Sequence, residues 1–468
     1  MSLHRWTLDP VFILLDFINE TMKTNLKLWS LTAAMAGLLF GFDTIVISGA
    51  EQELQELWKS YTLFGQNKLF HGWVVVASAL FGTVIGSILG GFPTDRLGRK
   101  KTLLVIGVLY SISALGSALV NDPWSFAIFR FIGGLGVGAS TIAAPAFISE
   151  IAPAAKRGRL VALYQLNIVI GILIGFISNL IIGAVVEIQE WRWMIGVEVF
   201  PAIVYTFLVI KVPESPRWLI SKKGDTMSAR KILSTIYNSA ETSAQIAAIQ
   251  KHQTDNVKKE FLLQPKFKVP VLLAFAVSFF NQFSGINAVL YYSVRIFEQA
   301  GLGQEAGLLS SVGLGIANLI FTILGVALID RIGRKKLMYL GSVGYIVTLT
   351  TTALSFMFGW TSVVPVALFL FIGSHAIGQG AIIWVFISEI FPNNIRAAGQ
   401  SFGNSVHWVL AAIIPAMVPF LMDVNVFGPT NVFGIFAGFM VLQLVWVVFI
   451  MPETKGVSLE ELQDKLTK

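Results

Sequence analysis

Twelve apolar runs, each long enough to cross a membrane, constrain the fold of this chain more than any other feature of its sequence. The hydrocarbon core of a bilayer is about 30 Å thick, and a helix needs about 20 apolar residues to cross it. The runs are long and continuous, whereas the strands of a β-barrel are short and alternate in polarity. Backbone groups in hydrocarbon must also pair within their own segment, so we expect helices. The expected spans are 28–49, 72–92, 101–120, 124–148, 160–186, 194–212, 268–298, 306–329, 337–357, 363–391, 399–423 and 430–451.

The composition agrees with a surface that faces lipid. Only 13% of the 468 residues are charged and 55% are hydrophobic, whereas a soluble globular protein carries roughly 25% charged residues. A chain of this length has too few charges to cover a surface in water. The sequence therefore predicts a multi-pass protein of the cell membrane, either a bacterial inner membrane or a plasma membrane. The chain has no cysteine, so it forms no disulfide.

The placement of basic residues predicts the orientation. They cluster in the even-numbered connections between spans, around residues 96–101, 156–159 and 331–336, and in the segment 217–231 after the sixth span. Cytoplasmic loops carry the excess of Lys and Arg, so both termini should be cytoplasmic. The net charge of +7 follows from this topology and does not argue for a nucleic-acid partner.

The chain repeats itself. The sequence DRLGRKK at 95–101 recurs as DRIGRKK at 330–336, and SEI at 149–151 recurs at 388–390. The dipeptide PE at 213–214 recurs at 452–453, and FIG at 131–133 recurs at 371–373. These motifs keep nearly the same offset, which indicates two six-helix bundles related by duplication, a common plan among secondary transporters.

The fold class that follows is an all-α membrane protein of twelve transmembrane helices, in two pseudo-symmetric six-helix bundles with a cytoplasmic helical linker. We expect a cytoplasmic tail at 1–27, the first bundle at 28–213, the linker at 214–266, the second bundle at 267–451 and a second tail at 452–468. Residues 9–20 are either a short helix at the membrane surface or part of a disordered tail.

The repeated motifs should meet at the cytoplasmic ends of the helices. Gly98 and Gly333 permit tight reversals, and the basic residues after them complement the negative ends of neighbouring helices. Glu150 and Glu389 can pair with Arg99 and Arg334. We interpret the set as salt bridges that latch the inner face in one of two states, with topological anchoring as the alternative. The latch residues are Asp95, Arg99, Glu150, Arg157, Glu214, Arg217, Asp330, Arg334, Glu389, Arg396 and Glu453.

Several motifs of this chain resemble the sugar porter family of the major facilitator superfamily. They are the repeated motifs quoted above, RFIGGLGVG at 130–138, PESPRW at 213–218, NQFSGIN at 281–287 and PETKG at 452–456. The resemblance covers about residues 28–456, and the motifs are specific in combination. The family includes glucose facilitators and proton-coupled xylose and hexose symporters. The resemblance implies the major facilitator fold and transport of a monosaccharide by alternating access.

Two opposite charges lie inside expected spans. Asp43 is about 22 Å from the cytoplasmic side of span one, and Arg130 is about 10 Å inside span four from the outer side, so the two share a similar depth. An intramembrane charge is costly and usually has a partner and a function. Protonation of Asp43 would weaken the pair and free the arginine, which makes a proton switch. The proton symporters of the family look like this at both positions, whereas its glucose facilitators tend to have a neutral residue at position 43; a purely structural ion pair is the alternative.

A sugar site should lie near the membrane midplane between the two bundles. Amides can donate and accept hydrogen bonds to vicinal hydroxyls, and an aromatic face covers the C–H surface of a sugar. Five positions match the sugar ligands of the family: Gln165, Gln282, Asn287, Asn318 and Trp384. Asn281, His407 and Trp408 are further possible ligands. Single amides also serve to join helices. Gly285 is expected to interrupt span seven, so that its outer part can move as a gate.

The sequence also departs from the family. Asn281 stands where many relatives have glutamine, and His407 stands where they often carry Gln or Asn. The stretch GQGAIIW at 378–384 lacks the prolines that kink span ten in sugar facilitators, although its glycines still permit bending. His375 is a second intramembrane histidine, either a titratable group or, as we favour, a hydrogen-bonded structural residue.

The sequence therefore predicts a symporter that imports a monosaccharide, hexose or pentose, with a proton. A facilitative sugar uniporter and a symporter of a polyol, inositol or organic acid remain open, and a sensor without transport is less expected because only 16 residues follow Pro452. No nucleotide-binding G-K-[ST] motif and no cluster of metal ligands or nucleophiles occurs in the chain. We expect no enzymatic activity, no cofactor, no metal and no nucleic-acid partner, and a protein that works as a monomer.

Overall fold

The computed structural model describes residues 24–154, 156–254, 261–262, 264–392, 395–457, 461–462 and 466. Within these residues, twelve helical segments are long and apolar enough to cross a membrane. They run Thr24–Leu57, Asn67–Leu89, Arg99–Leu119, Pro123–Ile151, Arg157–Val185, Glu190–Ile210, Pro265–Tyr291, Gln304–Ile332, Arg334–Phe358, Val363–Ile390, Arg396–Leu421 and Gly428–Phe449. Each contains most of one span expected from the apolar runs, so the twelve-span prediction is confirmed.

The spans are built from α-helices with a few irregular turns. The first six comprise α2 (Thr24–Leu57), α3 (Asn67–Phe70), η1 (His71–Val76), α4 (Ser78–Leu89), α5 (Gly91–Arg96), α6 (Arg99–Leu119), α7 (Pro123–Ile151), α8 (Arg157–Val185), α9 (Glu190–Gly196) and α10 (Val199–Ile210). The last six comprise η3 (Pro265–Phe267), α14 (Lys268–Phe283), α15 (Ile286–Tyr291), α16 (Ser293–Gln299), α17 (Gln304–Ile332), α18 (Arg334–Phe358), α19 (Val363–His375), η4 (Ala376–Gly380), α20 (Ala381–Ile390), α21 (Arg396–Leu421) and α22 (Gly428–Phe449).

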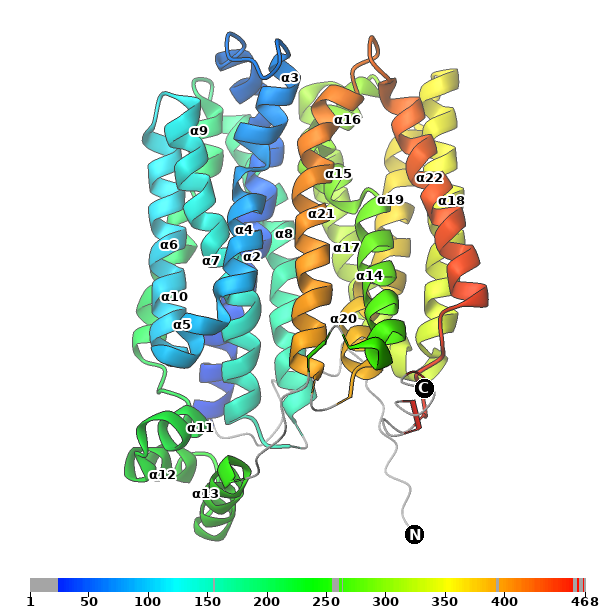
Figure 1. The fold of residues 1–468 in the computed structure, drawn as a ribbon. Helices are drawn as coiled ribbons and strands as arrows, with labels where there is room; N and C mark the ends of the chain where they lie inside the picture. The colour runs from blue at the N-terminus through cyan, green and yellow to red at the C-terminus, as the bar shows by residue number, and fades with distance from the viewer. Residues whose placement is uncertain are drawn as a thin grey trace.

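The first six spans lie on one side of the molecule and the last six on the other (Figure 1). The two halves meet where α8 packs on α17 and α4 packs on α21. Helices in lipid pack most closely through small residues, and α2 and α8 show this within the first half. A Cβ on Gly41 would lie 1.9 Å from the Ile168 carbonyl oxygen, and one on Gly171 would lie 2.1 Å from that of Leu38.

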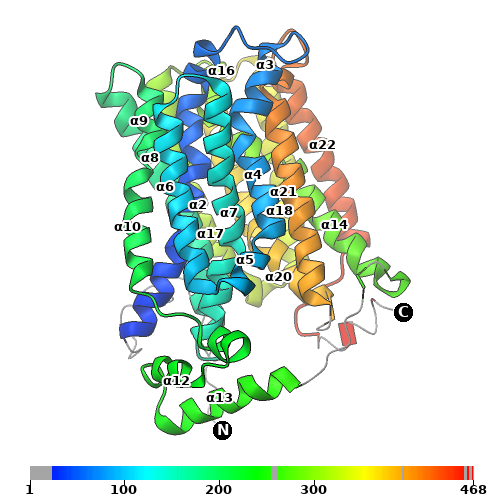
Figure 2. The ribbon, with the colours of Figure 1, turned by 60° about the vertical axis from the view of Figure 1, so that its left-hand side comes forward.

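The segment that connects the two halves in sequence forms three short helices, which project from one end of the bundle (Figures 1 and 2). They are α11 (Pro216–Trp218), α12 (Thr226–Ser234) and α13 (Ser239–Thr254), with η2 (Leu219–Lys223) after α11. They enclose a small core of Ile220, Ala229, Leu233 and Ile246. We call this the linker end, which the basic residues predict to be cytoplasmic, and the opposite end the outer end. The expected surface helix at 9–20 lies outside the described residues, and the proposed domain boundaries stay a prediction.

Three spans are irregular where function is expected. In span seven, Gly285 adopts φ +82 and separates α14 from α15, and a Cβ there would lie 2.4 Å from the Phe436 ring. This residue must therefore be glycine, and the expected interruption is present. Span ten, whose stretch 378–384 lacks prolines, contains the π-helical turn η4, and span two contains the π-helical turn η1. Such turns are rare and occur frequently at functional sites.

Candidate substrate and proton sites

The structure pairs the two intramembrane charges. Arg130 Nη1 lies 2.5 Å from Asp43 Oδ1, and Arg130 Nη2 donates to the Asp43 carbonyl oxygen at 3.1 Å. Both side chains are buried, on α7 and α2 respectively. Breaking a buried pair of this kind leaves an uncompensated charge. A proton on Asp43 would therefore change the electrostatics of the first half markedly.

A third ionisable residue, Glu198, lies beside this pair, and sequence reasoning did not single it out. Glu198 stands between α9 and α10 in span six and is fully buried. It is close enough to interact electrostatically with both Asp43 and Arg130. Neither carboxylate oxygen has a hydrogen-bond partner among the described residues. The signal was available, since Glu198 is an acid inside an expected span.

The amides of span seven form one hydrogen-bonded cluster. Gln282 donates from Nε2 to Asn281 Oδ1 at 2.9 Å, and its Oε1 accepts from Asn287 Nδ2 at 2.9 Å. The same Nε2 lies 3.2 Å from Nδ1 and 3.3 Å from Nε2 of His407, on α21. The cluster flanks the helix break at Gly285, so it brings together two predicted ligands, Gln282 and Asn287, and two possible ones, Asn281 and His407.

Aromatic rings continue this cluster toward the first half. The ring centroids of Trp384 and His407 are 5.0 Å apart, those of His407 and Trp408 are 5.1 Å apart, and Trp408 lies 5.6 Å from Phe40 on α2. Trp384 is 38% exposed, whereas Trp408 is buried. The indole Nε1 of Trp408 is a buried donor with no partner among the described residues. It is therefore available to a polar group that the protein itself does not supply.

Two predicted ligands lie apart from this cluster in the described contacts. Asn318, on α17, accepts a hydrogen bond from Thr322 at 3.3 Å. Gln165, on α8, is half-buried and takes part in none of the hydrogen bonds described. Since α8 and α17 pack against each other, the two amides belong to neighbouring helices at the boundary between halves. Their role as sugar ligands stays a prediction.

His375 is hydrogen-bonded to a tyrosine of the neighbouring span. Tyr345 OH on α18 and His375 Nδ1 lie 2.6 Å apart, so the two side chains share a hydrogen bond. The histidine ends α19 just before the turn η4. A hydrogen-bonded histidine is what we favoured, and the contact ties span nine to the bend in span ten.

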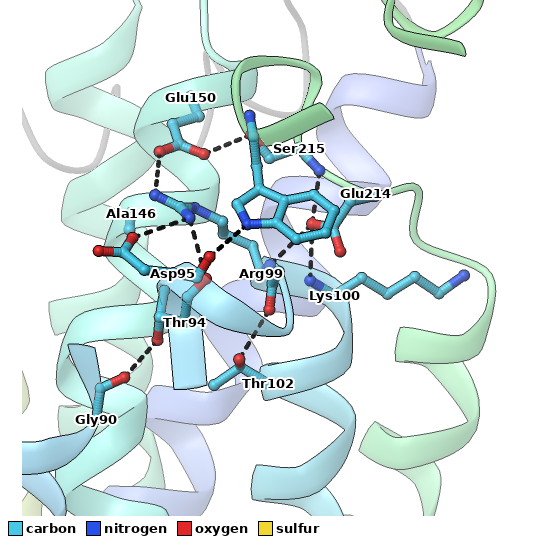
Figure 3. A network of polar contacts seen from close by, with 12 residues as sticks. Gly90, Thr94, Asp95, Arg99, Lys100, Thr102, Ala146, Glu150, Glu214 and Ser215 are labelled. Carbon is cyan, nitrogen blue, oxygen red and sulfur yellow. Dashed lines mark hydrogen bonds and ion pairs between the residues drawn. The ribbon is translucent and has the colours of Figure 1, made fainter. Parts of the chain in front are cut away.

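The repeated motifs form a network at the linker end of the first half (Figure 3). Arg99 Nη2 lies 2.8 Å from Glu150 Oε1, and Nη1 lies 3.2 Å from Asp95 Oδ1. Glu214 Oε1 accepts from the backbone N–H groups of Arg99 at 2.8 Å and Lys100 at 3.1 Å. A carboxylate at a helix N-terminus complements the helix dipole. The network thus joins spans two, three and four to the linker.

The second half repeats the main contacts of this network. Arg334 Nη2 lies 2.9 Å from Glu389 Oε1, Nη1 lies 3.1 Å from Asp330, and Glu453 accepts from the backbone N–H of Arg334 at 2.9 Å. The reversals before α6 and α18 have φ +97 at Gly98 and +103 at Gly333. A Cβ at these glycines would lie 2.2 Å from Glu214 and 2.7 Å from Glu453. Each reversal therefore requires glycine for two reasons, the positive φ and the close approach of a glutamate side chain.

Neither network crosses between the halves: each pair just described joins residues of one half to each other or to the segment that directly follows that half. Three members of the predicted latch are not brought into them. Arg396 donates from Nε to the Phe391 carbonyl at 3.3 Å. Arg157 interacts electrostatically with Tyr237 of the linker. Arg217 takes no part in the described network. The role of the set as a latch between two states stays a prediction.

Contacts between the halves occur at the outer end. Arg295 Nε and Nη2, on α16, lie 2.8 and 2.5 Å from the carboxylate of Glu51 on α2. Gln52 donates to Glu298 at 2.8 Å, and Lys68 lies 2.6 Å from Asp423. The Lys68 ammonium and the backbone N–H of Asn425 lower the pKa of Asp423 below its ordinary value. The outer end is therefore held shut by polar contacts that sequence reasoning missed.

Comparison with known proteins agrees with this architecture. Residues 29–466 match the family model described as "Sugar (and other) transporter". The chain is 36% identical over 445 residues to the arabinose-proton symporter of Bacillus subtilis, covering 93% of each chain. It is 33% identical over 467 residues to the D-xylose-proton symporter of Escherichia coli, covering 93% of this chain and 94% of that protein.

Solved structures of the xylose transporter XylE from E. coli match the whole fold. The inward open conformation gives a TM-score of 0.83 at 31% identity, covering 93% of this chain and 99% of that chain. The structure bound to 6-bromo-6-deoxy-D-glucose gives a TM-score of 0.77 at 30% identity, covering 95% and 99%. The higher score for the inward open form is consistent with the closed outer end.

Proposed function

Because this chain belongs to the sugar porter family of the major facilitator superfamily, and is a sugar transporter rather than an enzyme, we propose that it imports a monosaccharide together with a proton. The observation that carries the proton coupling is the buried Asp43–Arg130 pair. The relatives named above are described as arabinose-proton and D-xylose-proton symporters. We transfer that activity here on the chemistry of this chain's own residues.

The proton step rests on charge balance. With Asp43 ionised, Arg130 is paired and the site is close to neutral, apart from Glu198. With Asp43 protonated, the short Arg130–Asp43 contact loses its charge attraction, and the arginine must seek another acceptor. Glu198 can supply that acceptor, because its carboxyl group lies beside Arg130 and its two oxygens have no described hydrogen-bond partner. Protonation of Asp43 would therefore shift α2 relative to α7 and α10, which is a way to couple a proton to helix movement.

The sugar step rests on the polar cluster of span seven. Gln282, Asn287 and Asn281 offer amide donors and acceptors side by side, with His407 next to them. The half-exposed Trp384 supplies an apolar face, and the unpaired Nε1 of Trp408 supplies a donor. A monosaccharide presents hydroxyls on its rim and C–H groups on its face, so it fits this combination. Gln165 and Asn318 would complete the site from α8 and α17 when the halves close around the sugar.

The cycle follows from the asymmetry of the two ends. The outer contacts described above must break for the outward-facing state, and binding of proton and sugar favours their return. Release then occurs toward the linker end, where the two matching networks sit within their own halves and let each half move as a rigid unit. The networks at Arg99 and Arg334 would set how easily the inner ends separate, which is the latch role predicted from sequence.

The test compares accumulation with exchange in Asp43→Asn. In energised cells, the native chain should concentrate labelled sugar many-fold above the outside level, and Asp43→Asn should bring it only to equality. In preloaded, de-energised vesicles, the same variant should still exchange inside for outside sugar. Asp122→Asn, which alters an exposed helix cap near the outer end, is the matched control and should behave like the native chain. Unchanged accumulation by Asp43→Asn would remove the coupling assignment.

Other outcomes point to the alternatives. Equilibration without accumulation by the native chain would indicate a facilitative uniporter. Accumulation of inositol or a polyol, and not of a hexose or pentose, would correct the substrate class. Sugar binding without any flux would indicate a sensor. We expect the protein to act as a monomer in the membrane, with both termini cytoplasmic.

A further inference from the structure

Three buried side chains at the outer end form a cluster that neither the sugar site nor the proton site uses. Glu51 lies on α2, His71 begins the π-helical turn η1, and Arg295 lies on α16. Glu51 is 0% exposed, His71 is 1% exposed and Arg295 is 9% exposed. The first two residues belong to one half and the third belongs to the other. We call these three residues the outer triad.

The bonding within the outer triad balances the charge. The Glu51 carboxylate accepts from Arg295 through both Oε1 and Oε2, in a two-pronged pair. Its Oε2 also lies 3.0 Å from Nε2 of His71. Because the carboxylate is an acceptor in every one of these contacts, Nε2 of His71 carries the hydrogen. One negative and one positive charge are thus buried together, and the imidazole adds a hydrogen bond.

The other ring nitrogen of His71 has no partner. Nδ1 is fully buried, and no described atom hydrogen-bonds to it. A neutral imidazole tolerates this, since Nδ1 then bears only a lone pair. A charged imidazolium would bury an N–H without an acceptor and leave the triad with a net positive charge. Both are costly for a buried side chain.

The surroundings of His71 offer no compensation. The charged groups that act on it are Glu51 from α2 and Arg295 from α16. Lys68, on the preceding α3, is engaged with Asp423. The elements α4, α7 and α21 also pack against this turn, and none of their described charged groups is among those that act on His71. The closed arrangement is therefore built for an uncharged histidine.

We propose that the outer triad is a gate between the two halves that closes only on an uncharged His71, so that external acid holds the transporter open to the outside. Opening separates α16 from α2 and admits water to all three side chains. A histidine in water takes up a proton near pH 6.5. Closure then requires release of that proton. The gate does not depend on which cargo is carried or on proton coupling at Asp43.

The direction of the effect follows from linkage. A proton that binds the open state and not the closed state favours opening as pH falls through about 6.5. Between pH 7.5 and 5.5, a histidine with this affinity changes the open-to-closed ratio about tenfold. Uptake should accordingly stop rising, and then fall, as the outside is acidified below about pH 6.

The absence of cysteine makes the measurement direct. Spin labels on Ser60→Cys and Val424→Cys, two exposed positions at the outer ends of opposite halves, report the distance across the gate in nanodiscs. In the native background, the ratio of long to short distances should rise about tenfold from pH 7.5 to pH 5.5. In His71→Gln, which keeps an N–H donor near Glu51 and cannot become charged, the ratio should change less than twofold.

Two controls separate this gate from other contacts and from the proton site. Removing the second outer ion pair, with Lys68→Gln and Asp423→Asn, should open the gate at both pH values and leave the tenfold pH response intact. Asp423 stays ionised over this range because Lys68 and the Asn425 N–H hold its pKa below the ordinary value of 3.8. The pH response should also survive in Asp43→Asn, whether or not proton symport is confirmed.

Arg295→Gln tests the closed pair itself. It leaves Glu51 buried without its cation, so the open state should increase at least tenfold already at pH 7.5. A pH response that persists unchanged in His71→Gln would overturn the role of the histidine. An open-to-closed ratio in Arg295→Gln equal to that of the native chain would overturn the gate.

Discussion

The two halves share one backbone plan and nearly identical networks at the linker end, yet their interiors differ in kind. The first half buries ionisable side chains: Asp43, Arg130 and Glu198 lie together within it. Apart from Arg295 and Arg334 near its two ends, the described buried polar side chains of the second half are neutral. They include Gln282 in the cluster at span seven and a Gln379–Gln443 pair joined at 3.0 Å. The two halves are thus alike in their linker-end networks and different in their interiors.

Under the proposed symport, the difference teaches how one fold can handle two cargoes. A proton changes the energy of buried charges greatly, because ions in a dry interior interact strongly. A sugar is bound by directional hydrogen bonds that neutral amides supply without a large desolvation cost. In that proposal, the buried Asp43–Arg130 pair of the first half responds to the proton and the amide cluster of span seven responds to the sugar, while the boundary between the halves transmits the response.

Of the changes that test this difference between the halves, removal of the buried cation of the first half should have the largest effect on stability. Arg130→Ala leaves Asp43 buried and unpaired, and should lower the free energy of unfolding by about 3–5 kcal/mol. The double variant Asp43→Asn/Arg130→Gln should recover most of that loss, because no charge is then stranded. Thermal unfolding in detergent measures both. A single variant as stable as the native chain would contradict a buried, mutually dependent pair.

The neutral half is tested by two amides of equal burial. Gln282→Ala removes hydrogen bonds to Asn281 and Asn287 and should weaken sugar binding about tenfold or more, since each lost polar contact is worth about 1 kcal/mol. Gln443→Ala removes a bond to Ser342 at 2.8 Å, away from the sugar site. It should lower the unfolding temperature and leave affinity within about twofold. Equal effects of both variants on affinity, measured by isothermal calorimetry, would assign Gln282 to structure alone.

The smallest effect concerns the matching networks. Arg99→Ala and Arg334→Ala should each cost about 1–3 kcal/mol of stability. The first should cost slightly more, because the side chain of Glu150 is 10% exposed and that of Glu389 is 23% exposed. Comparing the unfolding temperatures of the two variants measures the difference. A large gap in the opposite direction would show that the two networks are not equivalent.

The spans and the duplicated motifs could be predicted from sequence because both depend on short-range rules. Length and polarity define a span, and Gly98 and Gly333 each predict a reversal of the chain. The Asp43–Arg130 pair was predictable because two opposite intramembrane charges at similar depth have few other solutions. Its geometry confirms the pairing, and its function remains the proposal above.

The outer triad could not be predicted for a physical reason. Glu51 and His71 lie just beyond the apolar runs at 28–49 and 72–92, where a charged residue normally reaches water. The packing of α16 against α2, and of α4, α7 and α21 around η1, buries them, and no local pattern encodes those contacts. Glu198 was different: it stood inside an expected span, and the rule that found Asp43 applied to it as well.

Proton movement together with sugar is the central feature of the proposed function, and one measurement tests it directly. Sugars are added in turn to a weakly buffered, de-energised suspension of cells that express the protein, and the external pH is recorded. We predict alkalinisation on adding one monosaccharide, absent in cells that express Asp43→Asn. Labelled sugar that equilibrates across the membrane with no pH change would contradict symport, and would leave Asp43 and Arg130 as a structural pair.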